Sequence, residues 1–524
     1  MRVSTSQIYN IATIGMAQAQ AAIVKTEEQI ATGKRVLSPA DDPVAAANIL
    51  QLNQDLARTE QYKKNIDIAD NSLSLEETSL DAIEDIMQRM REIAVRAGNT
   101  AVLTAADYKS LAAEVDTRIE ELMNLQNTRN ASGQYIFSGY KGDTQPFVNN
   151  GGGNYSYMGD EGQLRLQASA SVSVAVSDSG KKLFVDVPSG HNTFNSSAGA
   201  ANRAVPPGII NVGEVIDQEA FDKFYPEDMV ITFNAPSAAA VPPAANYTIT
   251  ERSTGKVLVA NATYVKGEAI EVNGVRVNIS GSPAAPIPAS LPFNFDAAAA
   301  PIDFSAVPAT FKMTVNGRSE TFTINTVVNN ATDFAAALNA PPNNTKLANL
   351  GVTASAAGFV ADSGKNISLS GGNANLNNAM GLAVTSGVSS TNGVTGDSFF
   401  VESTNKQGLL STLSRFSEAM KSVKDSPESK AELSKIIAKT LVNVSNAVTN
   451  VSSVLGEVGA RQNTLESAKD LNLDVTLFTR QTLKNLESVD VAEASIQLKM
   501  QSLVLTASQQ GFAKVSQLTL FSYL

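Results

Sequence analysis

Cysteine and tryptophan are absent from this chain of 524 residues, and histidine occurs once, at His191. Without cysteine the chain can form no disulfide, no thiolate nucleophile and no thiolate metal site. The single histidine lies in a turn-like segment and has no second imidazole with which to complete a zinc site, and the sequence contains no His-Glu-x-x-His motif. We therefore expect neither a metal nor a cofactor.

Long apolar runs and an excess of positive charge are also missing. The formal net charge is -11, which repels phosphate backbones and argues against a nucleic-acid partner. No apolar run approaches the roughly 20 residues that span a bilayer, so we expect no membrane insertion. Polar residues are scattered through the first 30 positions, where a signal peptide needs an unbroken apolar stretch. Export, if it occurs, is expected to use a route without a cleaved signal.

No arrangement of a nucleophile with a base is visible in the sequence. The glycine clusters at 151–153 and 371–372 are not followed by a helix that begins with the Lys-Ser/Thr pair of a phosphate loop. An enzyme needs such a set of groups, so we expect a protein that acts by assembly and not by catalysis.

Proline is confined almost entirely to the middle of the chain, because 16 of the 19 prolines fall between Pro146 and Pro342. Proline inside a helix removes a hydrogen bond and clashes with the preceding turn. The flanks therefore predict long helices over 43–98, 104–129 and 429–486. Apolar residues recur every seven positions in the two longest of these, at Ile66, Leu73, Leu80 and Met87 in the first and at Ile437, Val444, Val451, Val458 and Leu465 in the last.

The same seven-residue spacing occurs near both ends of the chain. It returns an apolar side chain to one face every two helical turns, which is typical of helices that pack along their length. It predicts helices over 5–34 and 490–521 that contact each other and partner chains, and that stay mobile until partners arrive. The predicted interface residues are Tyr9, Met16, Ile23 and Ile30 at one end and Val491, Leu498, Leu505 and Phe512 at the other.

A turn joins the first two predicted helices. Gly33 ends the first helix, as glycine often does. The segment Ser38-Pro39-Ala40-Asp41-Asp42-Pro43 follows, in which Asp42 is a good N-cap for a helix whose first residue is Pro43. The Asp41-Asp42 pair could instead suggest a metal site or an acid–base pair, but its position directly before the proline favours capping.

The middle of the chain predicts short strands. Val172 to Val176 alternates with polar residues, and Leu183 to Val185 follows a turn. Asn-Gly pairs at 273–274 and 316–317 predict tight hairpins between apolar strands. After the second hairpin, the pattern predicts a short helix over 333–338 and strands at 352–354 and 367–369, which make a β-β-α-β-β unit.

Gln29-Ile30-Ala31-Thr32-Gly33-Lys34-Arg35, followed by the turn described above, resembles the N-terminal signature of the bacterial flagellin family. Asp-Asp-Pro at 41–43, Tyr135-Ile136-Phe137-Ser138-Gly139 and Thr144-Gln145-Pro146-Phe147 are similar to its hook-associated branch. The resemblance covers roughly residues 1–190 and 396–524. Gly281-Ser282-Pro283 and the segment from Gly396 to Val401 look like two halves of one strand-turn segment, which makes 285–393 look like an inserted domain.

The predicted fold class is α+β, with long antiparallel helical rods and a coiled coil built from both termini, and one or two β-rich outer domains inserted between them. The predicted segments are 1–40 (N-terminal coiled-coil helix), 41–146 (rod), 147–190 (hairpin region beside the rod), 191–284 with 394–402 (outer domain), 285–393 (inserted domain), 403–488 (rod) and 489–524 (C-terminal coiled-coil helix).

The resemblance implies a structural subunit of the bacterial flagellum at the junction between hook and filament, needed for filament assembly and motility. It implies partners: further copies of the chain, hook-associated protein 1, flagellin, and an export chaperone covering residues 485–524. It also implies passage through the flagellar type III apparatus to an extracellular site. Two other functions stay open, namely an atypical filament flagellin and an adhesin whose binding surface lies within 190–395.

Overall fold

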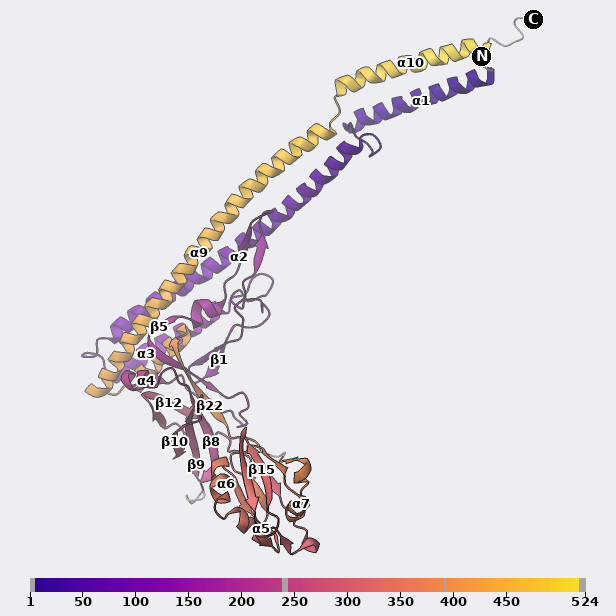
Figure 1. Cartoon of the computed structure of the whole chain (residues 1–524). Helices are drawn as coiled ribbons and strands as arrows, with labels where there is room; N and C mark the ends of the chain where they lie inside the picture. The colour runs from indigo at the N-terminus through magenta and orange to yellow at the C-terminus, as the bar shows by residue number, and fades with distance from the viewer. Residues whose placement is uncertain (1–4, 238–243, 391–392, 518–524) are drawn as a thin grey trace. The chain divides into compact units, whose positions relative to one another are not determined.

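The computed structural model describes residues 5–237, 244–390 and 393–517 (Figure 1). Its contacts divide the chain into two compact units. The terminal unit comprises residues 1–75, 164–177 and 457–524, and the middle unit comprises 76–163 and 178–456. Long helices from both ends of the sequence accompany a β-rich central region, so the predicted α+β fold class is confirmed.

The terminal unit is helical. The chain runs through one helix, turns, and begins a second, and near the other end it finishes a long helix, turns, and forms a last one. These are α1 (Thr5–Thr32), the start of α2 (Pro43–Ala97), the end of α9 (Pro427–Glu487) and α10 (Val491–Gln517). The predicted bounds agree to within two or three residues, except that residues 518–521 of the predicted last helix lie outside the described part of the chain.

A small hairpin covers the rods of the terminal unit. Strands β3 (Arg165–Gln167) and β4 (Ser173–Ala175) pair in antiparallel fashion. The side chain of Asn65 on α2 donates to the carbonyl of Gln167 at 2.9 Å, and that of Asn472 on α9 donates to the carbonyl of Ala168 at 2.8 Å. Two backbone carbonyls of the hairpin segment therefore accept hydrogen bonds from side chains of both long helices.

The middle unit begins with the remaining parts of α2 and α9, joined by α3 (Ala105–Gln126) and α8 (Leu409–Ser422). Thr104 and Asp107 form a reciprocal capping box at the start of α3. Sequence analysis missed α8, although its apolar residues Leu409, Leu413, Phe416 and Met420 recur at helical spacing and are almost fully buried. Polar residues between these positions interrupt the apolar pattern, so the helical periodicity is visible only when the whole segment is considered.

The seven-residue repeats of both long helices face inward. Every one of the nine apolar residues predicted from them is at most 4% exposed. Burying side chains of this size stabilises the fold by about 1.5–3 kcal/mol each relative to exposure, so these stripes hold the rods together.

Beyond the helices, the middle unit contains two sheets with a shared core. The larger has the order β10 (Val257–Thr263), β9 (Ala244–Glu251), β8 (Met229–Ser237), β22 (Ser398–Lys406) and β5 (Pro188–Ala198). The smaller has the order β11 (Ala269–Val272), β12 (Val275–Ser280) and β6 (Ile209–Ile210), with β7 (Glu214–Val215) also on β12. The helix α4 (Gln218–Phe224) adds Phe221 to a core that includes Phe194, Phe233 and Phe399.

The Asn273-Gly274 hairpin has the predicted form, with φ values of 46° and 77°. Another prediction is wrong: Leu183 to Val185 is no strand but part of η1 (Lys181–Val185), a single wide helical turn. A strand would send Leu183 and Phe184 to opposite faces, whereas both are buried here, and the Phe184 ring lies 5.3 Å from that of Phe137. A further hairpin, β1 (Phe147–Gly151) with β2 (Asn154–Tyr157), lies nearby in the sequence.

Residues 289–388 build a second, separate hydrophobic core. Its sheets are β16-β15-β20-β21, β13-β19-β18 and β14-β17. The bounds are β13 (Ala289–Pro292), η2 (Ala297–Ala299), β14 (Ile302–Asp303), β15 (Ala309–Val315), β16 (Arg318–Ile324), β17 (Val327–Val328), α5 (Ala331–Leu338), α6 (Asn343–Leu350), β18 (Thr353–Ser355), β19 (Gly358–Ala361), β20 (Ile367–Gly371), α7 (Ala374–Met380), η3 (Val384–Ser386) and β21 (Val388–Ser389).

The predicted β-β-α-β-β pattern is present as β15, β16, α5, β18 and β20, but sequence analysis missed α6 and β19 between them. Both are short; α6 contains several Asn residues and β19 begins with Gly, and these residue types elsewhere indicate loops. The core of 24 buried residues supports our proposal that 285–393 is a domain of its own.

Asp397 ties together the two strands that lead into and out of this core. Its carboxylate accepts backbone hydrogen bonds from Arg203 at 2.7 Å and from Ala284 at 2.8 Å. Ile287 and Val394 then pair as an isolated antiparallel bridge. The incoming and outgoing segments therefore lie side by side, as an insertion into an existing strand-turn segment requires.

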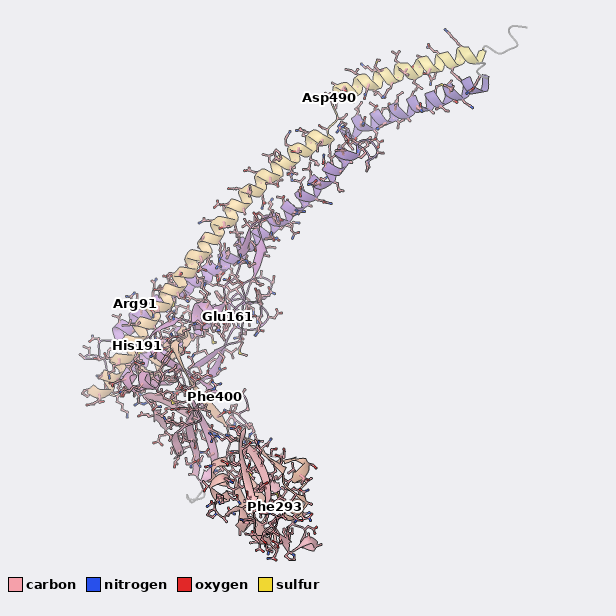
Figure 2. The ribbon with its side chains drawn as sticks, in the orientation of Figure 1. Arg91, Glu161, His191, Phe293, Phe400 and Asp490 are labelled. Atoms are coloured by element: carbon pink, nitrogen blue, oxygen red, sulfur yellow. The ribbon has the colours of Figure 1, made fainter. Side chains whose placement is uncertain are left out.

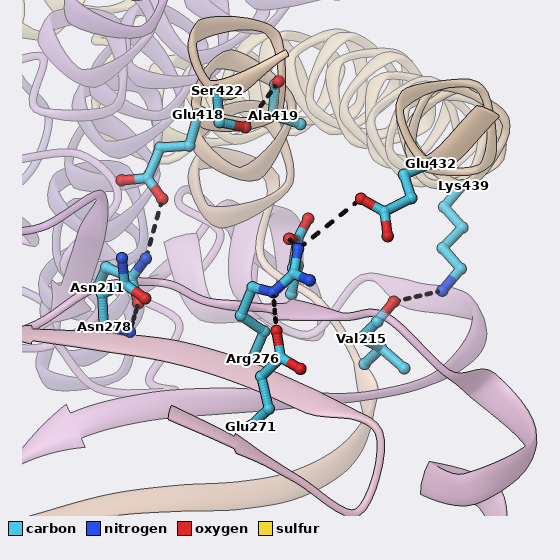
Figure 3. Close-up of polar contacts among 11 residues, drawn as sticks. Asn211, Val215, Glu271, Arg276, Asn278, Glu418, Ala419, Ser422, Glu432 and Lys439 are labelled. Carbon is cyan, nitrogen blue, oxygen red and sulfur yellow. Dashed lines mark hydrogen bonds and ion pairs between the residues drawn. The ribbon is translucent and has the colours of Figure 1, made fainter. Parts of the chain in front are cut away.

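Figure 3 shows the polar contacts between the smaller sheet and the helices of the middle unit. Arg276 on β12 pairs with Glu271 at 2.6 Å and, more loosely, with Glu432 on α9 at 3.9 Å. The Lys439 ammonium on α9 lies 3.3 Å from the carbonyl of Val215. These contacts join the sheet to the helices of the middle unit.

Glu418 on α8 lies in the same region and accepts a hydrogen bond of 3.3 Å from the side chain of Asn211. Burial raises its pKa to about 7, and the nearby carboxylate of Glu214 adds to this, whereas Lys421, the Asn211 hydrogen bond and Arg415 oppose it. Arg415 is itself buried, donates to Thr193 at 2.6 Å, and has a pKa lowered by burial to about 10.

We expect Glu418→Gln to stabilise the protein above pH 7. The ordinary carboxyl pKa is 4.5 and the folded value is about 7, so between these values the unfolded chain releases a proton that the folded chain keeps, and stability falls as the pH rises. The neutral variant avoids this cost, on the order of 1–3 kcal/mol at pH 8 and close to zero below pH 4.5.

Urea midpoints followed by circular dichroism at pH 5 and pH 8 measure this difference. Glu268→Gln is the matched control, because Glu268 is exposed in the same unit. Equal midpoints of wild type and Glu418→Gln at pH 8 would contradict the raised pKa.

Candidate functional site

Helices α1 and α10 of the terminal unit lie antiparallel along their whole length (Figure 1). At one end the ring of Tyr9 meets that of Phe512 edge-on, with centroids 4.9 Å apart. Closer to the rods, the hydroxyl of Thr26 lies 3.0 Å from the side-chain oxygen of Gln501. The two extremities of the chain thus cover one face of each other.

The predicted interface residues lie mostly on this shared face. Six of them are half-buried there, while Tyr9 remains 37% exposed and Val491, in the first turn of α10, 53% exposed. At that end Ala494 is the buried residue, at 4%. The half-buried six are Met16, Ile23, Ile30, Leu498, Leu505 and Phe512.

The other face of each helix carries a second apolar stripe that sequence analysis missed. On α10, Ile496, Met500 and Leu503 follow i, i+4, i+7 spacing and are 58–65% exposed. On α1, Ile11 and Ile14 are 64% and 57% exposed. The spacing is visible in the sequence, but the seven-residue repeat on the inner face is the longer and more regular pattern. An apolar surface of this kind marks a site for protein partners.

Backbone pairing joins the α1–α2 turn to the α9–α10 turn. The amide of Arg35 donates to the carbonyl of Glu487 at 2.6 Å, and the amide of Val489 donates to that of Gly33 at 3.0 Å. Lys34 and Ser488 pair as an antiparallel bridge. We call residues 33–35 and 487–489 the joint, because they lock two turns that lie far apart in the sequence.

The signature turn beside the joint is held by its aspartates. Asp41 pairs with Lys25 at 2.5 Å and accepts from the amide of Ser38 at 2.8 Å, and these contacts lower its pKa to about 2. Asp42 accepts from the amide of Ala45 at 2.9 Å, and this cap lowers its pKa too. The predicted capping role of Asp42 before Pro43 is therefore what the structure shows, and Ser38 and Pro39 form the turn itself.

The other half of the joint leads into α10 through Asp490, which is labelled in Figure 2. Its carboxylate accepts from the amides of Ala492 and Glu493, at 2.9 and 3.1 Å, and so caps the helix. Lys34 also pairs with Glu487 across the joint at 3.4 Å. Both terminal helices are thus anchored at the joint.

The described part of the chain holds neither a cluster of metal ligands nor a membrane-spanning helix. There, no three His, Cys, Asp or Glu side chains converge as a metal site would require, and no helix has the length and apolar character to cross a bilayer. His191 is exposed on β5. The terminal helices and their joint are the strongest candidate for the functional site.

Residues 3–142 match the bacterial flagellin N-terminal helical region. This stretch includes α1, the joint's first half, the capped turn and α2. This part of the chain is therefore similar to the bacterial flagellin family.

The chain is 36% identical over 189 residues to flagellar hook-associated protein 3 of Escherichia coli and 35% identical to that of Salmonella typhimurium. The match covers 36% of this chain, which spans 58% of the length of each of these relatives. Flagellin of Listeria monocytogenes is 31% identical over a shorter stretch of 116 residues.

Among solved structures, the crystal structure of flagellar hook-associated protein-3 from Legionella pneumophila is similar at a TM-score of 0.43 and 22% identity. That alignment covers 84% of this chain and 98% of the other.

We expect Gly33→Ala to weaken the joint. Gly33 has φ of +69°, and no heavy atom lies within 4 Å of where a Cβ would be placed. Alanine at this position therefore causes no clash, and its cost is the backbone strain of the left-handed conformation, about 1–2 kcal/mol. Gly15→Ala is the matched control, because Gly15 lies inside α1 with open space and an ordinary φ, and alanine there should stabilise the helix by about 0.5–1 kcal/mol.

Hydrogen exchange at the amides of Arg35 and Val489 measures the joint directly. Faster exchange is expected for Gly33→Ala and not for Gly15→Ala. Unchanged exchange in the first variant would show that the joint does not depend on the left-handed glycine.

Proposed function

We propose that this chain is a structural subunit of the bacterial flagellum, the adaptor at the junction between hook and filament, needed for filament assembly and motility. The uncovered apolar stripes on the terminal helices carry the proposal. A two-helix pair buries one face of each helix and leaves the others in water, so the exposed Ile496, Met500 and Leu503 need neighbouring chains to cover them.

The match to hook-associated proteins favours the junction over the filament itself, because it extends over more residues and at higher identity than the match to flagellin. In this role, further copies of the chain form a ring in the axial structure. One side of the ring contacts hook-associated protein 1 and the other contacts flagellin. The work is done by binding surfaces, and no reaction is involved.

We further propose that the chain leaves the cell through the flagellar type III apparatus without a cleaved signal, and that a chaperone covers residues 485–524 beforehand. Of these, 518–524 lie outside the described residues. The physical reason is that α10 exposes apolar surface on the face away from α1, and such a face favours premature association.

Complementation of cells that lack this chain tests the main proposal. We expect wild type to restore filaments, and the triple variant Ile496→Gln, Met500→Gln, Leu503→Gln to leave hooks without filaments and flagellin shed into the medium. The same substitution at Val257, Val265 and Val307 is the matched control, because these apolar residues are exposed in the outer region; it should restore filaments.

Electron microscopy of the cells measures filament assembly, and immunoblotting of the medium measures export of the chain. Variant chain found in the medium shows that export is intact. Normal filaments on cells carrying the triple variant would contradict the proposal.

Calorimetric titration tests the chaperone. Removal of residues 490–524 is expected to abolish binding of the flagellar export chaperone, because the apolar face of α10 is then gone, while circular dichroism should still report the strands of the middle unit. An affinity equal to that of the full chain would overturn this part of the proposal.

A further inference from the structure

A third apolar stripe lies on α9, in the terminal unit. Leu471, Val475 and Phe478 follow i, i+4, i+7 spacing and are 54%, 42% and 74% exposed. In the described part of the chain no aromatic side chain is more exposed than Phe478. Asp470 and Asp474 are exposed beside this stripe, so an acidic edge accompanies an apolar ridge.

The middle unit has a groove of about 610 Å³ between α2 and α9. Val95, which is 60% exposed, and Val448 provide apolar surface in it. Arg91, which is labelled in Figure 2, and Arg96 lie along it. The remaining lining residues are Gln88, Glu92, Ser445 and Thr449.

Two arginine side chains bring positive charge to the groove. The carboxylate of Glu92 is held by Arg89 at 2.9 Å, and Arg89 also pairs with Glu114 at 2.7 Å. Within the described ranges, neither Arg91 nor Arg96 has an acidic partner closer than 4.0 Å. The groove therefore combines apolar surface with two guanidinium groups that form no direct ion pair among the described residues.

We propose that the ridge of Leu471, Val475 and Phe478 docks into the groove of Val95 and Val448 on a second copy of this chain. The inference rests on the proposed function, which requires many copies to assemble. The ridge and the groove lie on the long helices α2 and α9, and they are separate from the exposed stripes of the terminal helices α1 and α10. Apolar side chains meet apolar side chains, and the acidic edge of one copy meets the arginines of the next.

The occupant is a second copy because both complementary surfaces belong to this sequence. Ridge and groove are different patches, so the contact is head-to-tail: each copy uses its ridge on one neighbour and offers its groove to another. Such a contact continues from copy to copy and closes only into a ring or extends as a helix, whereas a twofold contact would stop at a dimer.

The absence of cysteine from the chain makes disulfide cross-linking a clean test. Purified full-length Phe478→Cys is mixed with full-length Val95→Cys and oxidised with copper phenanthroline. A band of twice the chain mass that contains both variants is expected. Val205→Cys replaces Val95→Cys in the matched control, since Val205 is 94% exposed in the middle unit; its yield with Phe478→Cys should be at least tenfold lower.

Charge reversal tests the acidic edge. Adding Arg91→Glu to the groove partner should lower the cross-linking yield about tenfold, and adding Asp474→Lys to the ridge partner should restore it. The rescue distinguishes a direct contact from damage to the fold. If each substitution lowered the yield by unfolding its own chain, combining the two variants would not restore the yield.

A yield no higher than that of the Val205→Cys control overturns the inference, as does a yield indifferent to both charge reversals. If Phe478→Cys cross-links to flagellin and not to Val95→Cys, the ridge binds flagellin, and the inference is overturned as well. The failure of this contact can be told apart from the failure of the proposed function. If complementation gives the proposed result and Ile496→Cys chains cross-link to one another, but the ridge and groove variants do not cross-link, the junction function stands and only this contact is wrong.

Discussion

Two helices cannot bury more than one face of each other, and this constraint governs the ends of the molecule. The inner faces of α1 and α10 are half-buried against one another along seven-residue repeats, and the outer faces keep Ile496, Met500 and Leu503 in water. Exposed apolar surface is a free-energy cost that only a neighbouring chain can remove. The proposed role in assembly follows from that cost more than from any single residue.

The joint gives this exposed pair a defined anchor. Backbone hydrogen bonds between residues 33–35 and 487–489 connect turns that the sequence separates by more than four hundred positions. Asp41 and Asp42 hold one turn and Asp490 caps the helix beyond the other. The Asp41-Asp42 pair that could suggest a metal or a catalytic pair therefore serves the backbone, because Asp41 accepts amide hydrogen bonds within the turn and Asp42 accepts one at the start of α2.

The outer part of the chain follows a different rule, since it buries its own apolar surface. Residues 289–388 enclose 24 buried residues in a core that is separate from that of the neighbouring sheets. Asp397 and the Ile287–Val394 bridge hold its two connections together. A module that satisfies itself in this way can be inserted in a strand-turn segment without disturbing the sheet on either side.

Sequence alone determined the features that depend on local periodicity and turn chemistry. The long helices, their buried seven-residue stripes, the Asp42 cap and the Asn-Gly hairpins were all predictable, because 3.6-residue and two-residue periods and left-handed turn residues act within a few positions. Tertiary structure alone decided the rest. The burial of α8, the helical turn at Leu183 and the pairing of Gly33 with Val489 depend on residues that come together only in the fold, and no local pattern encodes such distant partners.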